Sequence, residues 1–258
     1  MKAATEEFLF LLLWGVDQAL RPTWRNFTGS FEQWAYHNGV GRRLETLRRQ
    51  ELLDVRPDED ENGMAVRLTE AGRVAALSGV DPQAAWNRPW DGAWRLVMFD
   101  LPEGQNKSRV KLRRSLKKMR FGYLQNSVWI SPDSFSAHEA SLSGAKINVE
   151  ALTLFEGRPV GGESDQDLVR GAWNFDLVTK RYAAWALVAG SVPKPQAPSE
   201  QAWEVLLAWA RRERAAWAEV VDCDPFLPAA LLPAGYPGRK CWAQRTALLK
   251  RIGQQLLA

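Results

Sequence analysis

Residues 94–132, WRLVMFDLPEGQNKSRVKLRRSLKKMRFGYLQNSVWISP, decide the fold of the chain. The first six are apolar or aromatic apart from one arginine, and Asp100 follows them, which predicts a buried strand that ends in a carboxylate. Over 107–120, apolar side chains recur at helical spacing among eight lysines and arginines and no acid. A second apolar run, 123–130, predicts a bent strand or hairpin. Strand, basic helix and hairpin together predict the first half of a ferredoxin-like βαββαβ domain.

The flanking sequence completes this central domain, which we expect over residues 92–157. A short helical pattern at 134–142 and a strand-like run at 147–155 supply the remaining helix and strand. The preceding segment, 81–90, holds two prolines and no clear period, and it is interpreted as a linker.

Composition limits the class of protein. The chain has 258 residues, of which 46% are hydrophobic and 25% charged, and a net charge of only +4, so polyanion binding would need clustered charge. Its two cysteines are far apart and it has only two histidines, which argues against a zinc site or a disulfide framework and favours a reducing cytoplasm. The apolar run 8–14 is too short to span a bilayer, and it lacks a signal-peptide cleavage site. We therefore expect a cytoplasmic protein without a membrane segment.

The N-terminal region, residues 1–80, has the order of a winged helix-turn-helix. Three helical patterns are followed by two strand-like segments around DEDENG, and then by a helix that Thr69 caps. In this arrangement the third helix, 41–50, enters the DNA major groove. The residues predicted to contact DNA are Arg42, Arg43, Thr46, Arg48 and Arg49. A solvated charged face is the alternative interpretation, and the acidic wing tip, 58–61, is expected to face away from the phosphates.

The last third of the chain, 165–258, predicts a helical domain. Wide apolar stripes at helical spacing occupy 174–188 and the long segment after Ser199, and 241–257 predicts a closing helix. The whole chain is therefore expected to be α+β: a winged helix-turn-helix, a ferredoxin-like domain and a helical domain.

Several of these segments resemble the PaaX (phenylacetic acid degradation repressor) family of transcriptional regulators. The resembling segments are WDGAWRLVMFDLPE (90–103), FGYLQNSVWISP (121–132), GAWNFDLVTKRYAAW (171–185), DPFLPAALLPAGYPGRK (224–240), RRLETLRRQELLDV (42–55) and RLTEAGR (67–73). The resemblance implies a homodimeric regulator, in the first place a repressor, that binds double-stranded DNA at a palindromic operator. It also implies an acyl-coenzyme A thioester as effector. Residues 215–219 read AAWAE where the family pattern is polar, so a different effector, or none, stays open.

The central pattern is also similar to the small ferredoxin-like subunit of the CRISPR adaptation complex, whose first strand ends in an aspartate. That similarity raises a metal-dependent endonuclease as the alternative function, with Asp100 as the catalytic residue and Asp100 and Glu103 holding Mg²⁺ or Mn²⁺. A lone carboxylate is a thin ligand set, and Asp100 is more simply explained as a turn cap or dimer contact. No nucleotide-binding or nucleophile motif is present, so the regulator hypothesis needs no cofactor.

The basic helix offers a second place for phosphate contact. Its candidate residues are Lys107, Lys111, Arg114 and Lys118. They would lie along a phosphate backbone, bind an acidic face of a protein or an effector's phosphates, or form a solvated surface. A third hypothesis makes the protein an interaction subunit, with the ferredoxin-like domain used for assembly.

Overall fold

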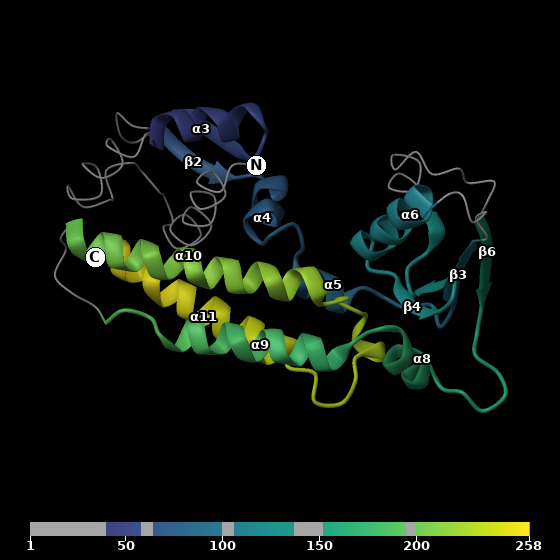
Figure 1. Ribbon diagram of the computed structural model, residues 1–258. Coiled ribbons are helices and arrows are strands. Elements are labelled where there is room, and N and C mark those ends of the chain that lie inside the picture. Colours follow the sequence, from purple (N-terminus) through teal and green to yellow (C-terminus); the bar gives the residue numbers. More distant parts are fainter. Residues whose placement is uncertain (1–39, 58–63, 100–105, 137–151, 195–199, 258) are drawn as a thin grey trace. The chain divides into compact units, whose positions relative to one another are not determined.

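The structure, a computed structural model, describes residues 40–57, 64–99, 106–136, 152–194 and 200–257. The chain forms two compact units. A helical unit contains residues 1–81, 181–222 and 237–258, and a sheet unit contains residues 82–180 and 223–236. The ribbon is drawn in Figure 1. The boundaries of the three expected domains stay predictions.

The sheet unit is built on four antiparallel strands in the order β4-β5-β3-β6. The strands are β3 (Trp94–Phe99), β4 (Gly122–Gln125), β5 (Val128–Ser131) and β6 (Leu152–Gly157). Leu96 of β3 lies opposite Ile130 of β5 on one side and Phe155 of β6 on the other. The first strand lies inside the sheet and the hairpin β4–β5 beside it, which is the strand order of a ferredoxin-like domain. The predicted mixed α/β central domain is thus confirmed in its strands. The predicted helix 134–142 lies mostly outside the described residues.

Alternate side chains of β3 enter two different cores, one on each face of the sheet. Val97 and Phe99 pack with Leu112 and Leu116 of α6 (Asn106–Lys118). On the opposite face, Trp94 packs with apolar residues of α8 (Asp165–Ala172) and of the short η4 helix (Ala229–Leu231). Because successive strand side chains point to opposite faces, one apolar strand can serve both cores.

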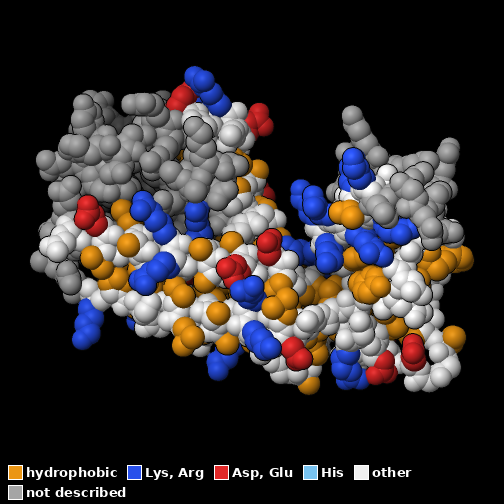
Figure 2. All heavy atoms as spheres, viewed as in Figure 1, with side chains coloured by type: hydrophobic (Ala, Val, Ile, Leu, Met, Phe, Trp, Pro, Cys, Tyr) orange, Lys and Arg blue, Asp and Glu red, His pale blue; other side chains and the backbone are white. Residues whose placement is uncertain are grey.

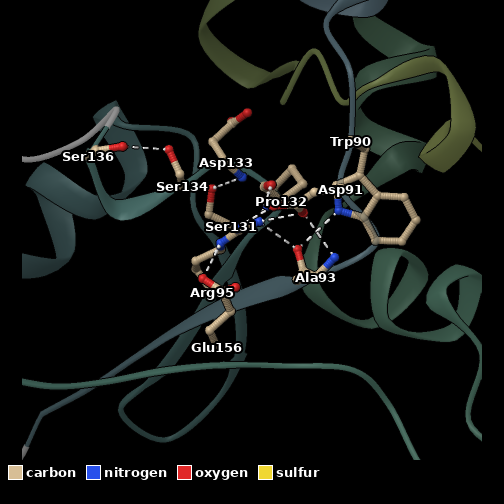
Figure 3. Close-up of polar contacts among 10 residues, drawn as sticks. All are labelled: Trp90, Asp91, Ala93, Arg95, Ser131, Pro132, Asp133, Ser134, Ser136 and Glu156. Atoms are coloured by element: carbon tan, nitrogen blue, oxygen red, sulfur yellow. Dashed lines mark hydrogen bonds and ion pairs between the residues drawn. The ribbon is translucent and has the colours of Figure 1, made fainter.

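Arg95 is the charged residue within β3, and hydrogen bonds to carboxylates and carbonyls compensate the burial of its guanidinium (Figure 3). It is 4% exposed. Its Nε atom donates to Glu156 at 3.0 Å, and its other nitrogens donate to Asp91 and to the carbonyls of Ala93 and Pro132. Hydrogen bonding from Arg95 holds the pKa of Asp91 well below its usual value, and Asp91 raises the pKa of Arg95. The guanidinium thus joins the start of β3 to β6 and to the end of β5.

The buried side chain of Asp224 holds the proline-rich segment 224–236 of the sheet unit together through hydrogen bonds. Asp224 accepts the backbone N–H of Phe226 at 2.8 Å and the hydroxyl of Tyr236. Arg120, just after α6, donates to the Asp224 carbonyl and lies 4.9 Å from the centroid of the Phe226 ring. Residues about one hundred positions apart in sequence therefore share one polar centre, in which the buried carboxylate is fully hydrogen-bonded.

The segment interpreted as a linker contains a helix, α5 (Pro82–Asn87). Trp86 is 3% exposed, and its indole Nε1 donates to the Tyr236 hydroxyl at 3.1 Å. Residues 82–87 of the expected linker therefore form a helix that Trp86 anchors. Proline is well accommodated at the first position of a helix, where its missing N–H needs no partner, so Pro82 starts α5 instead of preventing it.

The helical unit includes three long helices: α9 (Phe175–Gly190, from residue 181 onward), α10 (Glu200–Cys223) and α11 (Gly238–Leu257). Their interior holds an ion pair whose side chains are at most 1% exposed. Arg245 Nε lies 2.7 Å from Glu213 Oε1. The indole of Trp185 donates to the same oxygen at 2.8 Å, and the Arg245 guanidinium lies 4.6 Å from the centroid of Trp217. These contacts join all three helices.

Cys223 and Cys241 are both free thiols. Within the described ranges, no helix combines the length and the apolar composition that a membrane crossing requires.

Candidate nucleic-acid interface

In the second half of the helix α3 (Val40–Arg49), where the side chains are described, one side chain is buried and its neighbours are exposed. Leu47 is fully buried and anchors the helix. Its exposed side chains include Thr46, Arg48 and Arg49. The Nε atoms of Arg48 and Arg49 lie 3.3 Å and 3.0 Å from the carboxylate of Glu45. Surface pairs of this kind contribute less than about 1 kcal/mol, so both guanidiniums can leave Glu45 for a phosphate at little cost. Arg42 and Arg43 belong to the same helix, but their side chains lie outside the description.

A tight C-terminal cap fixes the last turn of α3. The backbone N–H of Leu52 donates to Leu47 O, and that of Glu51 donates to Arg48 O, both at 3.0 Å. This is a Schellman motif, and Glu51 takes the left-handed conformation that it requires, with φ at 57°. The turn that carries the two exposed arginines is therefore held by backbone hydrogen bonds.

A β-hairpin and a capped helix follow α3, as the sequence predicts. The strands β1 (Leu53–Pro57) and β2 (Met64–Leu68) are antiparallel, and the acidic wing tip lies outside the described residues. Thr69 caps α4 (Glu70–Ala76) by accepting the Gly72 N–H at 3.0 Å, and its hydroxyl donates to Glu51 O at 2.8 Å. These contacts fasten α4 to the end of α3. Helix, hairpin and helix agree with the second half of a winged helix, whereas the two helices predicted before Asn38 lie outside the description.

The helix α6 turns an apolar side to the sheet and a basic side to solvent. Leu112 and Leu116 are buried at 3% and 0% exposure. The predicted phosphate contacts Lys107, Lys111, Arg114 and Lys118 are all exposed. Their spacing of four, three and four residues places them along one side of the helix, and we call them the basic stripe. In Figure 2, lysine and arginine side chains gather over α6.

Comparison with known families gives one match within the sheet unit. Residues 87–169 match the model of the PaaX protein central Cas2-like domain. The central domain is of the PaaX type. The match begins at the end of α5, covers the four strands and α6, and ends in α8. A comparison with curated proteins found no significant match. A similar solved structure is the uncharacterized protein Rv0674 from Mycobacterium tuberculosis, with 21% identity, a TM-score of 0.48, and coverage of 84% of this chain and 82% of that chain.

The carboxylates of the nuclease alternative belong to the segment after β3 of the PaaX-type domain. Asp100 and Glu103 both fall outside the described residues, so their side chains are not placed. Across the part of the chain that is described, no three histidine, cysteine, aspartate or glutamate side chains gather as metal ligands. Metal binding at Asp100 and Glu103 stays a prediction.

Sequence reasoning missed a surface pocket of about 520 Å³ in the sheet unit. Its lining includes Tyr123, Trp173 and Phe175 together with Arg170 and Asp176, and the guanidinium of Arg170 is paired with Asp167 at 2.6 Å. The rings come from two blocks that the sequence had singled out, FGY and GAWNF, but nothing in either block shows that they meet. Three aromatic side chains beside one basic and one acidic side chain suit a planar apolar group.

Proposed function

We propose that the protein is a DNA-binding transcriptional regulator. The match of residues 87–169 to the PaaX central Cas2-like domain is the observation that carries this proposal. The N-terminal geometry supports it, because α3 presents Arg48 and Arg49 to solvent on a turn that is capped and joined to α4. Arg42, Arg43 and Thr46 complete the proposed reading helix.

The proposed mode of action is that of a repressor dimer. A two-fold dimer presents two copies of α3, which suits a palindromic operator whose half-sites are separated by about one helical turn or a multiple of it. Analytical ultracentrifugation of the purified protein tests the dimer. A monomer at micromolar concentration that also binds DNA as a monomer would contradict it.

An acyl-coenzyme A thioester is the proposed effector. The aromatic pocket supports this choice, since its aromatic side chains suit an apolar acyl group and Arg170 lines it. Titration of the protein–DNA complex with phenylacetyl-coenzyme A should release DNA, and Arg170→Ala should raise the concentration needed. If the thioester leaves DNA affinity unchanged in the wild type, the effector belongs to another class or does not exist.

Replacing Arg48 and Arg49 by alanine should weaken binding to DNA from the region upstream of the protein's own gene. Each contact of an arginine with a base or phosphate contributes about 1–3 kcal/mol, so the double variant should lose roughly tenfold or more in affinity. Fluorescence anisotropy with a labelled duplex measures this loss, and Arg42→Ala and Arg43→Ala should act in the same direction.

The matched control is Arg211→Ala with Arg212→Ala, an adjacent exposed arginine pair on α10. This control removes the same charge from a helix with no proposed contact to DNA. The reading helix is misplaced if both double variants lose the same affinity, or if neither loses any. Absence of binding by the wild type at low salt would remove the regulator proposal and favour an interaction subunit.

The regulator is proposed to bind DNA without cutting it. Supercoiled plasmid incubated with the protein and Mg²⁺ or Mn²⁺ should stay intact. Cleavage by the wild type that disappears in Asp100→Ala would establish the metal-dependent nuclease in place of a purely binding protein.

A further inference from the structure

Apart from Lys117 and Lys118 in the last turn, which the helix dipole favours, the charges of α6 do not stabilise the helix. The segment NKSRVKLRRSLKK contains seven basic residues and no acidic one. Lys107 lies in the first turn, where the helix dipole disfavours a cation. In the basic stripe, Lys107 faces Lys111 and Arg114 faces Lys118 at a separation of four residues, where like charges repel each other. A helix face that keeps these unfavourable charge interactions suggests a polyanionic partner that offsets them.

We propose that the basic stripe binds the phosphate backbone of DNA as a second contact, independent of base sequence. This inference rests on the proposed function, because it adds to the DNA contact of α3. Leu112 and Leu116 hold α6 on the sheet through their buried side chains, so the stripe is fixed on the solvent side of a rigid element. Its contact supplies affinity and salt dependence, and it leaves the choice of operator to α3.

The shape of the stripe favours DNA over the other anions that the sequence left open. From Lys107 to Lys118 it runs about 16 Å along the helix, a length over which a duplex carries roughly ten phosphate charges. The four exposed side chains follow one side of the helix in a line, whereas a site for one small phosphate would require side chains that converge. Three of the four are lysines, which act as compact point charges without the fixed fork geometry of arginine. A linear row of point charges suits a linear polyanion.

The experiment compares two faces of the same helix. Lys111→Gln with Arg114→Gln removes two charges from the stripe, and Lys117→Gln with Arg113→Gln removes one lysine and one arginine from a neighbouring exposed face. Affinity for the upstream duplex and for a scrambled duplex of equal composition is measured by anisotropy over a range of salt concentrations. Circular dichroism checks that all the variants are folded.

The stripe variant should make the plot of log affinity against log salt shallower by about 1.8, because each lost phosphate contact removes about 0.9 from the slope. The loss should be equal on both duplexes and less than half as large in the neighbouring-face variant. An unchanged slope, or equal losses from the two faces, overturns the proposal. So does a stripe variant that binds DNA normally, a result that an acidic protein partner would produce.

The measurements distinguish a wrong stripe proposal from a wrong regulator proposal. If the wild type binds neither duplex, the regulator proposal falls, and the stripe proposal falls with it. If the wild type binds and Arg48→Ala with Arg49→Ala weakens binding, while the stripe variant keeps its slope, only the stripe proposal falls.

Discussion

Gly72→Ala should unfold or severely destabilise the N-terminal part of the protein. A methyl group at this position would lie 2.0 Å from the backbone oxygen of Leu52, a distance that no pair of these atoms tolerates. That oxygen cannot easily move, because it accepts the Thr69 N–H at 3.1 Å. The helix α4 must therefore leave its place beside the end of α3. We expect a loss of about 3 kcal/mol or more in the free energy of unfolding, which corresponds to a fall of roughly 6–12 °C in Tm.

Thermal melts of Gly72→Ala and Gly190→Ala should separate this steric effect from a general effect of alanine. Nothing lies within 4 Å of a methyl group built on Gly190, which ends α9 in the same unit. Gly190→Ala should therefore be neutral or slightly stabilising. DNA binding should fail in the Gly72 variant alone, since α4 is fastened to the turn that carries Arg48 and Arg49. A Gly72→Ala protein with unchanged Tm would show that α4 does not approach Leu52 as described.

The motif around Gly72 predicts one structural feature of this site and does not predict another. The run LTEAGR predicts a helix capped by Thr69, and the structure confirms the cap. The reason for glycine in the third helical position is the close approach of Leu52, a residue in another turn. Local pattern reveals the capping hydrogen bond because both of its partners lie within the motif. It cannot reveal a steric limit set by a distant backbone atom.

The central sheet was predictable for a similar reason. The nearly continuous apolar run of β3, the basic helix and the interrupted apolar run specify strand, helix and hairpin from neighbouring residues. The residues that pack on the second face of the sheet could not be predicted from the sequence. Leu227 and Leu231 pack in the core that contains Trp94, and they belong to a proline-rich segment that the sequence assigned to the C-terminal domain. Their apolar character is visible in the sequence, but their partner is not.

The candidate site residues also differ in whether local sequence pattern could predict them. The exposure of Arg48, Arg49 and the basic stripe follows from helical spacing, since apolar residues fix which side is buried. The aromatic pocket was missed because Tyr123, Trp173 and Phe175 come from segments fifty residues apart. The interior pair of Glu213 and Arg245 was missed too, as a charged residue within a long helix is usually solvated.

Replacing Arg245 by leucine should destabilise the helical unit by about 3–5 kcal/mol. Its side chain is the ionic partner of Glu213, which is fully buried. Without the guanidinium, Glu213 keeps the indole N–H of Trp185 as a donor, but its negative charge stays in the interior without an opposite charge. We expect Tm to fall by roughly 10 °C or more, and a melt followed by tryptophan fluorescence measures the fall, since Trp185 and Trp217 adjoin the pair.

The exposed pair between Arg181 and Glu219 is the matched control. It also joins α9 to α10 through an arginine and a glutamate, but its side chains are 44% and 58% exposed. Arg181→Leu should cost less than about 1 kcal/mol, because water and salt screen the interaction. Equal losses in Arg181→Leu and Arg245→Leu would mean that burial does not set the cost of breaking the pair.

The double variant Glu213→Leu with Arg245→Leu decides how the pair acts. Removing both charges leaves no buried ion without a partner, and apolar side chains of similar size can fill the same space between the helices. The double variant should therefore recover most of the stability lost in Arg245→Leu. The losses in free energy of unfolding of the single variants Glu213→Leu and Arg245→Leu should together exceed the loss of the double variant by about 2 kcal/mol or more. Additive losses would instead show that each side chain stabilises the bundle through its own packing, with Arg245 acting mainly through its contact with the Trp217 ring.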